Sequence, residues 1–162
     1  GANHISSQQV SDLASVPENT SLLRVDSSGI ESRLRSNPWV EHVSLRRIFP
    51  NTLEIDVTER TLQAVVEVPS SRDQTTKSWA LASDGTWLMQ IPDESTEDAK
   101  SVPEKVYSDA TLALHITDVP YDVSPEPGAK VTDDSIRNAL DIITGFTTSL
   151  KDDVASVAAS SS

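Results

Sequence analysis

The stretch from Trp39 to Arg60 restricts the possible folds more than any other part of this 162-residue chain. Between Thr52 and Arg60 apolar and polar residues alternate, which is the period of a half-buried β-strand. The stretch from Trp39 to Arg47 has a similar pattern, in which Glu41 is the exception. The connecting residues Ile48-Phe49-Pro50-Asn51 are typical of a turn. We therefore predict an antiparallel hairpin with one apolar face.

Two short helices are predicted before this hairpin. Ser6 and Gln9 have the spacing of a capping box, in which each side chain satisfies a backbone N–H of the other residue. Ser28 and Glu31 have the same spacing and predict the start of the second helix. Pro38 predicts its end, because the residue before a proline is driven out of the helical region.

The remainder of the chain is predicted to be richer in strands. A strand is expected at Leu62–Val68, and Asp84-Gly85 is a strong signal for a second hairpin. Residues 92–105 and 117–130 are polar and contain prolines, so we expect irregular segments there. An amphipathic helix is predicted from Asp133 to Leu150. We therefore predict an α+β chain with a domain boundary near residue 60.

The formal net charge of −12 is unevenly distributed. Residues 1–60 contain 6 basic and 8 acidic residues, whereas residues 61–162 contain 7 and 17 and so carry −10 of the total. An acidic second half repels phosphate backbones and anionic lipid headgroups, which argues against a nucleic-acid partner and favours a basic protein surface. The chain has no cysteine, which excludes disulfides and thiolate metal sites.

Three segments of the chain carry a family resemblance. They are residues 1–10 with 21–26 (GANHISSQQV and SLLRVD), residues 37–60 (NPWVEHVSLRRIFPNTLEIDVTER), and Pro127-Gly128 with the helix predicted at 133–150. Together they resemble the FtsQ/DivIB family of bacterial cell-division proteins. The resemblance implies a POTRA domain over residues 1–60, of order β-α-α-β-β, whose first strand lies before Gly1. It also implies an antiparallel β domain with one late amphipathic helix over residues 61–162, whose last strands lie beyond Ser162.

The same resemblance implies a location and a function. The full-length protein is expected to be held in the bacterial cell membrane by one span, with this part on the extracytoplasmic side at the division septum. No stretch of this sequence approaches the roughly 20 apolar residues that a span requires. The expected function is that of a non-catalytic divisome scaffold that helps to coordinate septal cell-wall synthesis. The implied partners are small coiled-coil division proteins of the FtsB/DivIC and FtsL types and the septal peptidoglycan synthases.

The first predicted strand of the hairpin is the candidate site for binding a partner. In the POTRA order it is an edge of its sheet, and an edge strand can pair with an added strand from another chain. The side chains that would set specificity are those of His42, Leu45, Arg46 and Arg47. The simpler interpretation of Arg46-Arg47 is that both are solvated residues of an edge strand.

Nine further residues form the family motif and are expected to be mainly structural. They are Pro38, Trp39, Val40, Phe49, Pro50, Leu53, Ile55, Glu59 and Arg60. Trp39 is expected to be buried against the second helix, because large aromatic residues dominate small cores. Glu59-Arg60 is more simply a strand-end anchor than a partner contact.

The sequence offers no catalytic or metal-binding constellation and implies no cofactor. His4, His42 and His115 are far apart and lack ligand spacing. Glu54 and Asp56 lie on the face expected to meet water, whereas acid–base catalysis needs a pocket that shifts pKa values. Two alternatives to a division scaffold remain at this stage. One is a POTRA-type chaperone or receptor for exported polypeptides, and the other is a cell-wall glycan-binding or hydrolase module.

Overall fold

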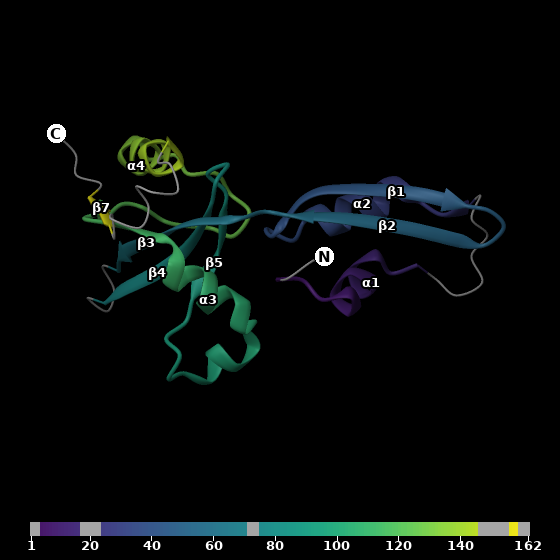
Figure 1. Cartoon of the computed structure of the whole chain (residues 1–162), viewed down its shortest axis with the longest axis horizontal. Coiled ribbons are helices and arrows are strands. Elements are labelled where there is room, and N and C mark those ends of the chain that lie inside the picture. The colour runs from purple at the N-terminus through teal and green to yellow at the C-terminus, as the bar shows by residue number, and fades with distance from the viewer. Residues whose placement is uncertain (1–3, 17–23, 71–74, 146–155, 159–162) are drawn as a thin grey trace. The chain divides into compact units, whose positions relative to one another are not determined.

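The computed structural model describes residues 4–16, 24–70, 75–145 and 156–158 (Figure 1). The chain divides into two compact units, Gly1–Arg60 and Thr61–Ser162. Both units combine helices with strands, which confirms the α+β class. Residues 1–3, 17–23 and 146–155 lie outside the described part, and with them Gly1-Ala2-Asn3, Leu22-Leu23 and the last residues of the predicted late helix.

The first unit is built from two helices and one hairpin. Its elements are α1 (Ser7–Ala14), α2 (Ser27–Arg35), β1 (Val40–Ile48) and β2 (Thr52–Glu59). β1 and β2 pair antiparallel, with Val40 opposite Glu59 and Ile48 opposite Thr52, as the alternation predicts. The register shifts between Val40 and His42, so a β-bulge accounts for the exception at Glu41. Val40 and Val43 are consequently both buried.

The two helix starts differ in how well the sequence predicts them. At α1 the capping box is present, because the Ser6 hydroxyl accepts a hydrogen bond from Gln9 N and the Gln9 side chain accepts one from Ser6 N. At α2 the predicted box of Ser28 and Glu31 is wrong. The cap is Asp26, whose Oδ1 accepts a hydrogen bond from Gly29 N at 3.0 Å.

The position of Asp26 explains this correction. Asp caps a helix as well as Ser does, and it stands before the first helical residue. Its carboxylate also lies close to Gly29, three residues later. A Cβ at Gly29 would lie 2.2 Å from Asp26 Oδ2, well inside van der Waals contact.

The second unit contains a five-stranded sheet. Its elements are β3 (Leu62–Pro69), β4 (Thr76–Ala82), β5 (Trp87–Ile91), the 3₁₀ helix η2 (Glu97–Ser101), α3 (Glu104–Leu112), β6 (Leu114–Thr117), α4 (Asp134–Gly145) and β7 (Ser156–Ala158). The strand order is β5-β4-β3-β6-β7. The turn between β4 and β5 is the predicted one, with Gly85 at φ +76° and Asp84 Oδ1 accepting from Thr86 N.

The sheet is mixed, whereas the sequence predicts an antiparallel one. β4 runs antiparallel to both β3 and β5, whereas β6 lies parallel to both β3 and β7. The physical reason is the connections, because parallel neighbours need a crossover of a dozen or more residues, usually helical. α4 lies in the crossover between β6 and β7. Residues 92–105, predicted to be irregular, hold η2 and the beginning of α3.

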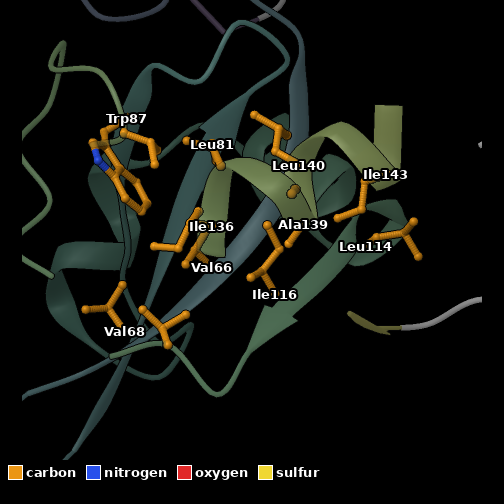
Figure 2. Packing of buried hydrophobic residues seen from close by; sticks show 13 residues of the cluster. Val66, Val68, Leu81, Trp87, Leu114, Ile116, Ile136, Ala139, Leu140 and Ile143 are labelled. Carbon is orange, nitrogen blue, oxygen red and sulfur yellow. The ribbon is translucent and has the colours of Figure 1, made fainter. Parts of the chain in front are cut away.

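The core of the second unit lies between the sheet and α4. Figure 2 shows the apolar stripe of α4 packed against side chains of the sheet. The stripe consists of Ile136, Ala139, Leu140 and Ile143, all of which are buried. Val65 is also buried, although its neighbours Ala64 and Val66 belong to the cluster under α4. Because side chains alternate along a strand, Val65 faces the opposite side, where α3 contacts β3.

The cap of α2 can be tested with a pair of substitutions. We expect Asp26→Ala to destabilise α2 by about 1 kcal/mol, because the N–H of Gly29 loses its acceptor. Ser28→Ala is the matched control and should change the stability by less than about 0.5 kcal/mol. Hydrogen exchange of the α2 amides measures both. Equal effects of the two substitutions would contradict the assignment of Asp26 as the cap.

A second test concerns the polar group buried beside the β4–β5 turn. Thr86 is 1% exposed, and among the described residues its Oγ1 has no hydrogen-bond partner. Thr86→Val replaces this hydroxyl by a methyl group, so we expect a gain in unfolding free energy of about 1 kcal/mol. Thr76→Val, at an exposed position of β4, should have little effect. A loss of thermal stability in Thr86→Val would show that the hydroxyl is hydrogen-bonded in solution.

Candidate functional site

The motif residues at the end of β2 hold the first unit together. The carboxylate of Glu59 accepts hydrogen bonds from Ile5 N at 2.8 Å and from His4 N at 3.0 Å. The same carboxylate lies 2.9 Å from Nδ1 of His4. The side chains of His4 and Glu59 are only 7% and 10% exposed. Glu59 therefore anchors the segment that leads into α1 to the last residue of the hairpin.

Trp39 completes this junction from the other side. Its ring stacks on the ring of His4, with centroids 4.2 Å apart and planes inclined by 11°. The predicted burial of Trp39 is confirmed, since 7% of its surface is exposed. The stacking partner is a residue that the sequence offered only as an unlikely metal ligand. No local pattern links His4 to Trp39, because the pair forms only when the hairpin returns to the beginning of the chain.

Arg60 fixes the beginning of β1. Its backbone N–H donates to Trp39 O at 2.8 Å, and its Nη1 donates to the carbonyls of Pro38 and Val40. The guanidinium therefore occupies the carbonyl of Val40, the first residue of β1, and that of Pro38, which precedes the strand. Glu59 and Arg60 are thus engaged with the backbone of their own unit.

The four residues predicted to set partner specificity differ in exposure and in their contacts within the unit. His42 is exposed and Leu45 is half-buried. Arg46 pairs with Glu54 across the hairpin at 2.9 Å. Arg47 reaches the loop before α2, where its Nη2 donates to Val25 O at 2.7 Å and to Ser27 Oγ at 2.9 Å.

These contacts separate the two adjacent arginines. Neighbouring residues of a strand point to opposite faces, so Arg46 follows the face of Glu54 and Arg47 the face of α2. Arg46, with 66% of its side chain exposed, is accessible to a partner. Arg47 also has a structural role.

The described part of the first unit leaves both edges of its hairpin without a third strand. The sheet has the order β1-β2. An unpaired strand edge presents N–H and C=O groups that another strand can complete. Arg60 occupies the carbonyls at the start of β1, so the accessible part of this edge begins after the bulge.

A groove lies between α1 and β2 in the first unit. Its volume is about 940 Å³. The apolar part of its lining comes from Val10, Ala14, Val16, Leu53, Ile55 and Val57. Two motif residues, Leu53 and Ile55, therefore face this groove and remain half-buried.

The remaining motif residues lie at the turn between β1 and β2. Phe49 is 67% exposed, and Pro50 is exposed as well. They do not contribute to the junction that Glu59 and Arg60 form at the opposite end of the strands. The structure thus divides the motif into a buried junction, a groove lining and an exposed turn.

One structural contact in this unit had no signal in the sequence. Arg33 of α2 donates from Nε to Leu13 O at 3.1 Å and from Nη2 to Ala14 O at 2.6 Å. These are carbonyls at the C-terminal end of α1, which need external donors. An arginine in an amphipathic helix usually indicates a solvated face, so its role as a clamp could not be predicted.

Among residues 4–16, 24–70, 75–145 and 156–158 no three His, Asp or Glu side chains are grouped to hold a metal ion. Glu54 is engaged with Arg46, and Asp56 is exposed at the groove. Within the same residues no helix has the length and apolar character of a membrane span.

Comparison with known proteins identifies the first unit. A sequence model of the FtsQ-type POTRA domain matches residues 1–60. Cell division protein FtsQ of Geobacter sp. strain M21 is 45% identical over 64 residues, which are 40% of this chain and 23% of that protein. The corresponding protein of Zymomonas mobilis is 35% identical over 65 residues, or 40% of this chain and 21% of that protein. That of Corynebacterium glutamicum is 32% identical over 60 residues, or 37% and 27%.

These matches confirm the predicted family resemblance and the POTRA fold. They also show how much of each relative is matched. The matched segments span only 21% to 27% of these three relatives.

The junction at Glu59 can be tested by a conservative substitution. Glu59→Gln keeps the shape but removes the charge that accepts the N–H groups of His4 and Ile5. We expect a loss of roughly 2 to 3 kcal/mol, because hydrogen bonds to a charged group are the stronger ones. Glu54→Gln, which removes an exposed ion pair, should cost less than about 1 kcal/mol. Hydrogen exchange of the α1 amides measures the effect, and the assigned anchor is wrong if the two variants exchange alike.

Proposed function

We propose that this chain, whose residues 1–60 match the FtsQ-type POTRA domain, is a divisome scaffold of the FtsQ/DivIB family that binds other division proteins. The single observation that carries the binding mechanism is the open edge of β1 in a two-stranded sheet. The name shared by the matched relatives, cell division protein, supports the division role. The proposed scaffold has no chemistry of its own.

The proposed location is the extracytoplasmic side of the bacterial cell membrane at the septum. One membrane span of the full-length protein would hold the chain there. This location is what the resemblance to the FtsQ/DivIB family implies. In this place the acidic surface of residues 61–162 would favour basic partner surfaces and speed their encounter.

The two edges of the hairpin have different proposed occupants. We propose that the groove between α1 and β2 receives the first strand of the POTRA order. Its apolar lining and the unpaired edge of β2 support this assignment. That leaves β1 as the edge available to another protein.

The partner would add an extended segment beside Val43–Ile48. Backbone hydrogen bonds would supply affinity in this arrangement, and side chains at alternate positions would supply specificity. His42 and Arg46 are exposed, and Leu45 is half-buried, so these three can contact the added strand. Arg47 would contribute mainly by holding the loop before α2 in place.

The proposed partners are coiled-coil division proteins of the FtsB/DivIC and FtsL types and the septal peptidoglycan synthases. Calorimetric titration of this chain with the extracytoplasmic segments of the coiled-coil proteins tests the scaffold function. Saturable binding by the folded chain is the expected result. Absence of binding would weaken the coiled-coil assignment.

Proline substitutions test the role of the β1 edge. Successive residues of a strand direct their N–H groups to opposite edges. Ser44→Pro and Leu45→Pro therefore affect different edges of β1, and each is the control for the other. One of them removes a donor to β2 and should unfold the hairpin, while the other removes only an outward donor. The folded variant should bind the partner at least about tenfold more weakly, since it cannot complete the added ladder. Unchanged affinity in a folded proline variant would rule out strand addition at β1.

A further inference from the structure

The turn between β1 and β2 presents two adjacent apolar side chains to solvent. Phe49 is 67% exposed and Ile48 is 44% exposed. The turn lies at the end of the hairpin opposite the junction at Glu59 (Figure 1). These side chains contribute little to the core of the unit, although exposing them to water is unfavourable. Their position therefore leaves them available for a contact outside the unit.

Three arginines belong to the segments next to this apolar turn. Arg46 and Arg47 directly precede Ile48, and Arg24 precedes Val25, whose carbonyl accepts a hydrogen bond from Arg47. The partners of Arg47 are an uncharged carbonyl and a hydroxyl, so these contacts leave its positive charge uncompensated. Arg24 is exposed.

Carboxylates only partly compensate these guanidinium groups. Glu54 pairs with Arg46, and Asp26 caps α2. The three arginines and two carboxylates of this region leave a positive local charge. The chain as a whole carries −12, so this sign is opposite to that of the rest of the molecule.

We propose that this turn, with Ile48, Phe49, Arg24, Arg46 and Arg47, is a docking surface for an anionic lipid bilayer. Apolar side chains beside guanidinium groups are the composition of elements that lie in a membrane interface. The ring of Phe49 and the side chain of Ile48 enter the boundary between headgroups and acyl chains. The arginines contact lipid phosphates, for which the guanidinium group is well suited. The inference rests on the proposed membrane location.

The shape and charge of the region favour a lipid surface over a protein partner. A turn that exposes two consecutive apolar residues is convex, and a bilayer accommodates a convex tip without a preformed pocket. The acidic part of the chain does not prevent this contact. Screening at physiological ionic strength acts over about 8 Å, so the local charge of the turn determines which part of the molecule approaches the bilayer.

Vesicle cosedimentation of the complete chain tests the proposal. The probes are vesicles of phosphatidylglycerol, which is anionic, and of phosphatidylcholine, which is zwitterionic. We expect binding to phosphatidylglycerol vesicles that weakens with added salt, and much weaker binding to phosphatidylcholine. Phe49→Ser should lower the apparent affinity about tenfold or more, since burial of one aromatic side chain is lost. Arg24→Gln should lower it about fivefold, the contribution of one basic residue near an anionic surface.

Leu112 provides the matched control. It is 84% exposed at the end of α3, far from the turn in sequence, and Leu112→Ser removes an apolar side chain of similar exposure. This variant should bind phosphatidylglycerol vesicles as the unchanged chain does. Circular dichroism and thermal unfolding establish that each variant is folded.

Three outcomes overturn the proposal. The chain does not bind phosphatidylglycerol vesicles, or folded Phe49→Ser binds them unchanged, or Leu112→Ser loses as much binding as Phe49→Ser. If Phe49→Ser instead weakens only the titration with division proteins, the turn is a protein contact. The proposed scaffold function is tested separately by that titration. If the chain binds the division proteins but not the vesicles, the lipid proposal is wrong and the scaffold proposal stands.

Discussion

The first unit depends on one carboxylate that binds backbone. Glu59 stands at the end of β2 and accepts the N–H groups of His4 and Ile5, so the last strand of the unit holds the segment that starts α1. Once this contact forms, the ring of His4 can stack on Trp39, and Arg60 lies where it bonds the carbonyls of Pro38 and Val40. A largely buried charge is stable only when such donors surround it. The small apolar core of the unit includes Leu34, Val40 and Val43.

Because the junction uses the ends of the strands, their edges and their turn stay accessible. The hairpin is closed at one end by Glu59 and Arg60 and carries Ile48 and Phe49 at the other. Its side toward α1 forms the apolar groove, and the outer side of β1 is unpaired within the described residues. The same short motif thus supplies a rigid support and the surfaces that we propose for other molecules. This arrangement suits a protein that works by contact, since surfaces on a rigid support bind with little loss of conformational entropy.

Some contacts could be predicted because they are local or periodic. The hairpin, the capping box of α1, the turn at Asp84-Gly85 and the apolar stripe of α4 all depend on residues close in sequence. The cap of α2 was assigned wrongly because Asp26 and Ser28 are both good caps, and the choice depends on where the helix begins. The parallel position of β6 was missed because a four-residue strand gives little periodic signal, and no local pattern specifies its neighbour.

The sequence by itself determined the class of the fold, the hairpin and the resemblance of residues 1–60 to the FtsQ-type POTRA domain, since the alternation and the long motif of residues 37–60 are read directly along the chain. Only the tertiary structure decided what the motif residues do. Glu59 and Arg60 could have formed a pair with each other or with a partner, and the folded chain gives both of them backbone partners distant in sequence. Arg46 and Arg47 have the same chemistry, but one pairs with Glu54 across the hairpin and the other bonds the loop before α2. The physical reason is that a side chain's role depends on which groups surround it, and those groups come together only when distant parts of the chain pack.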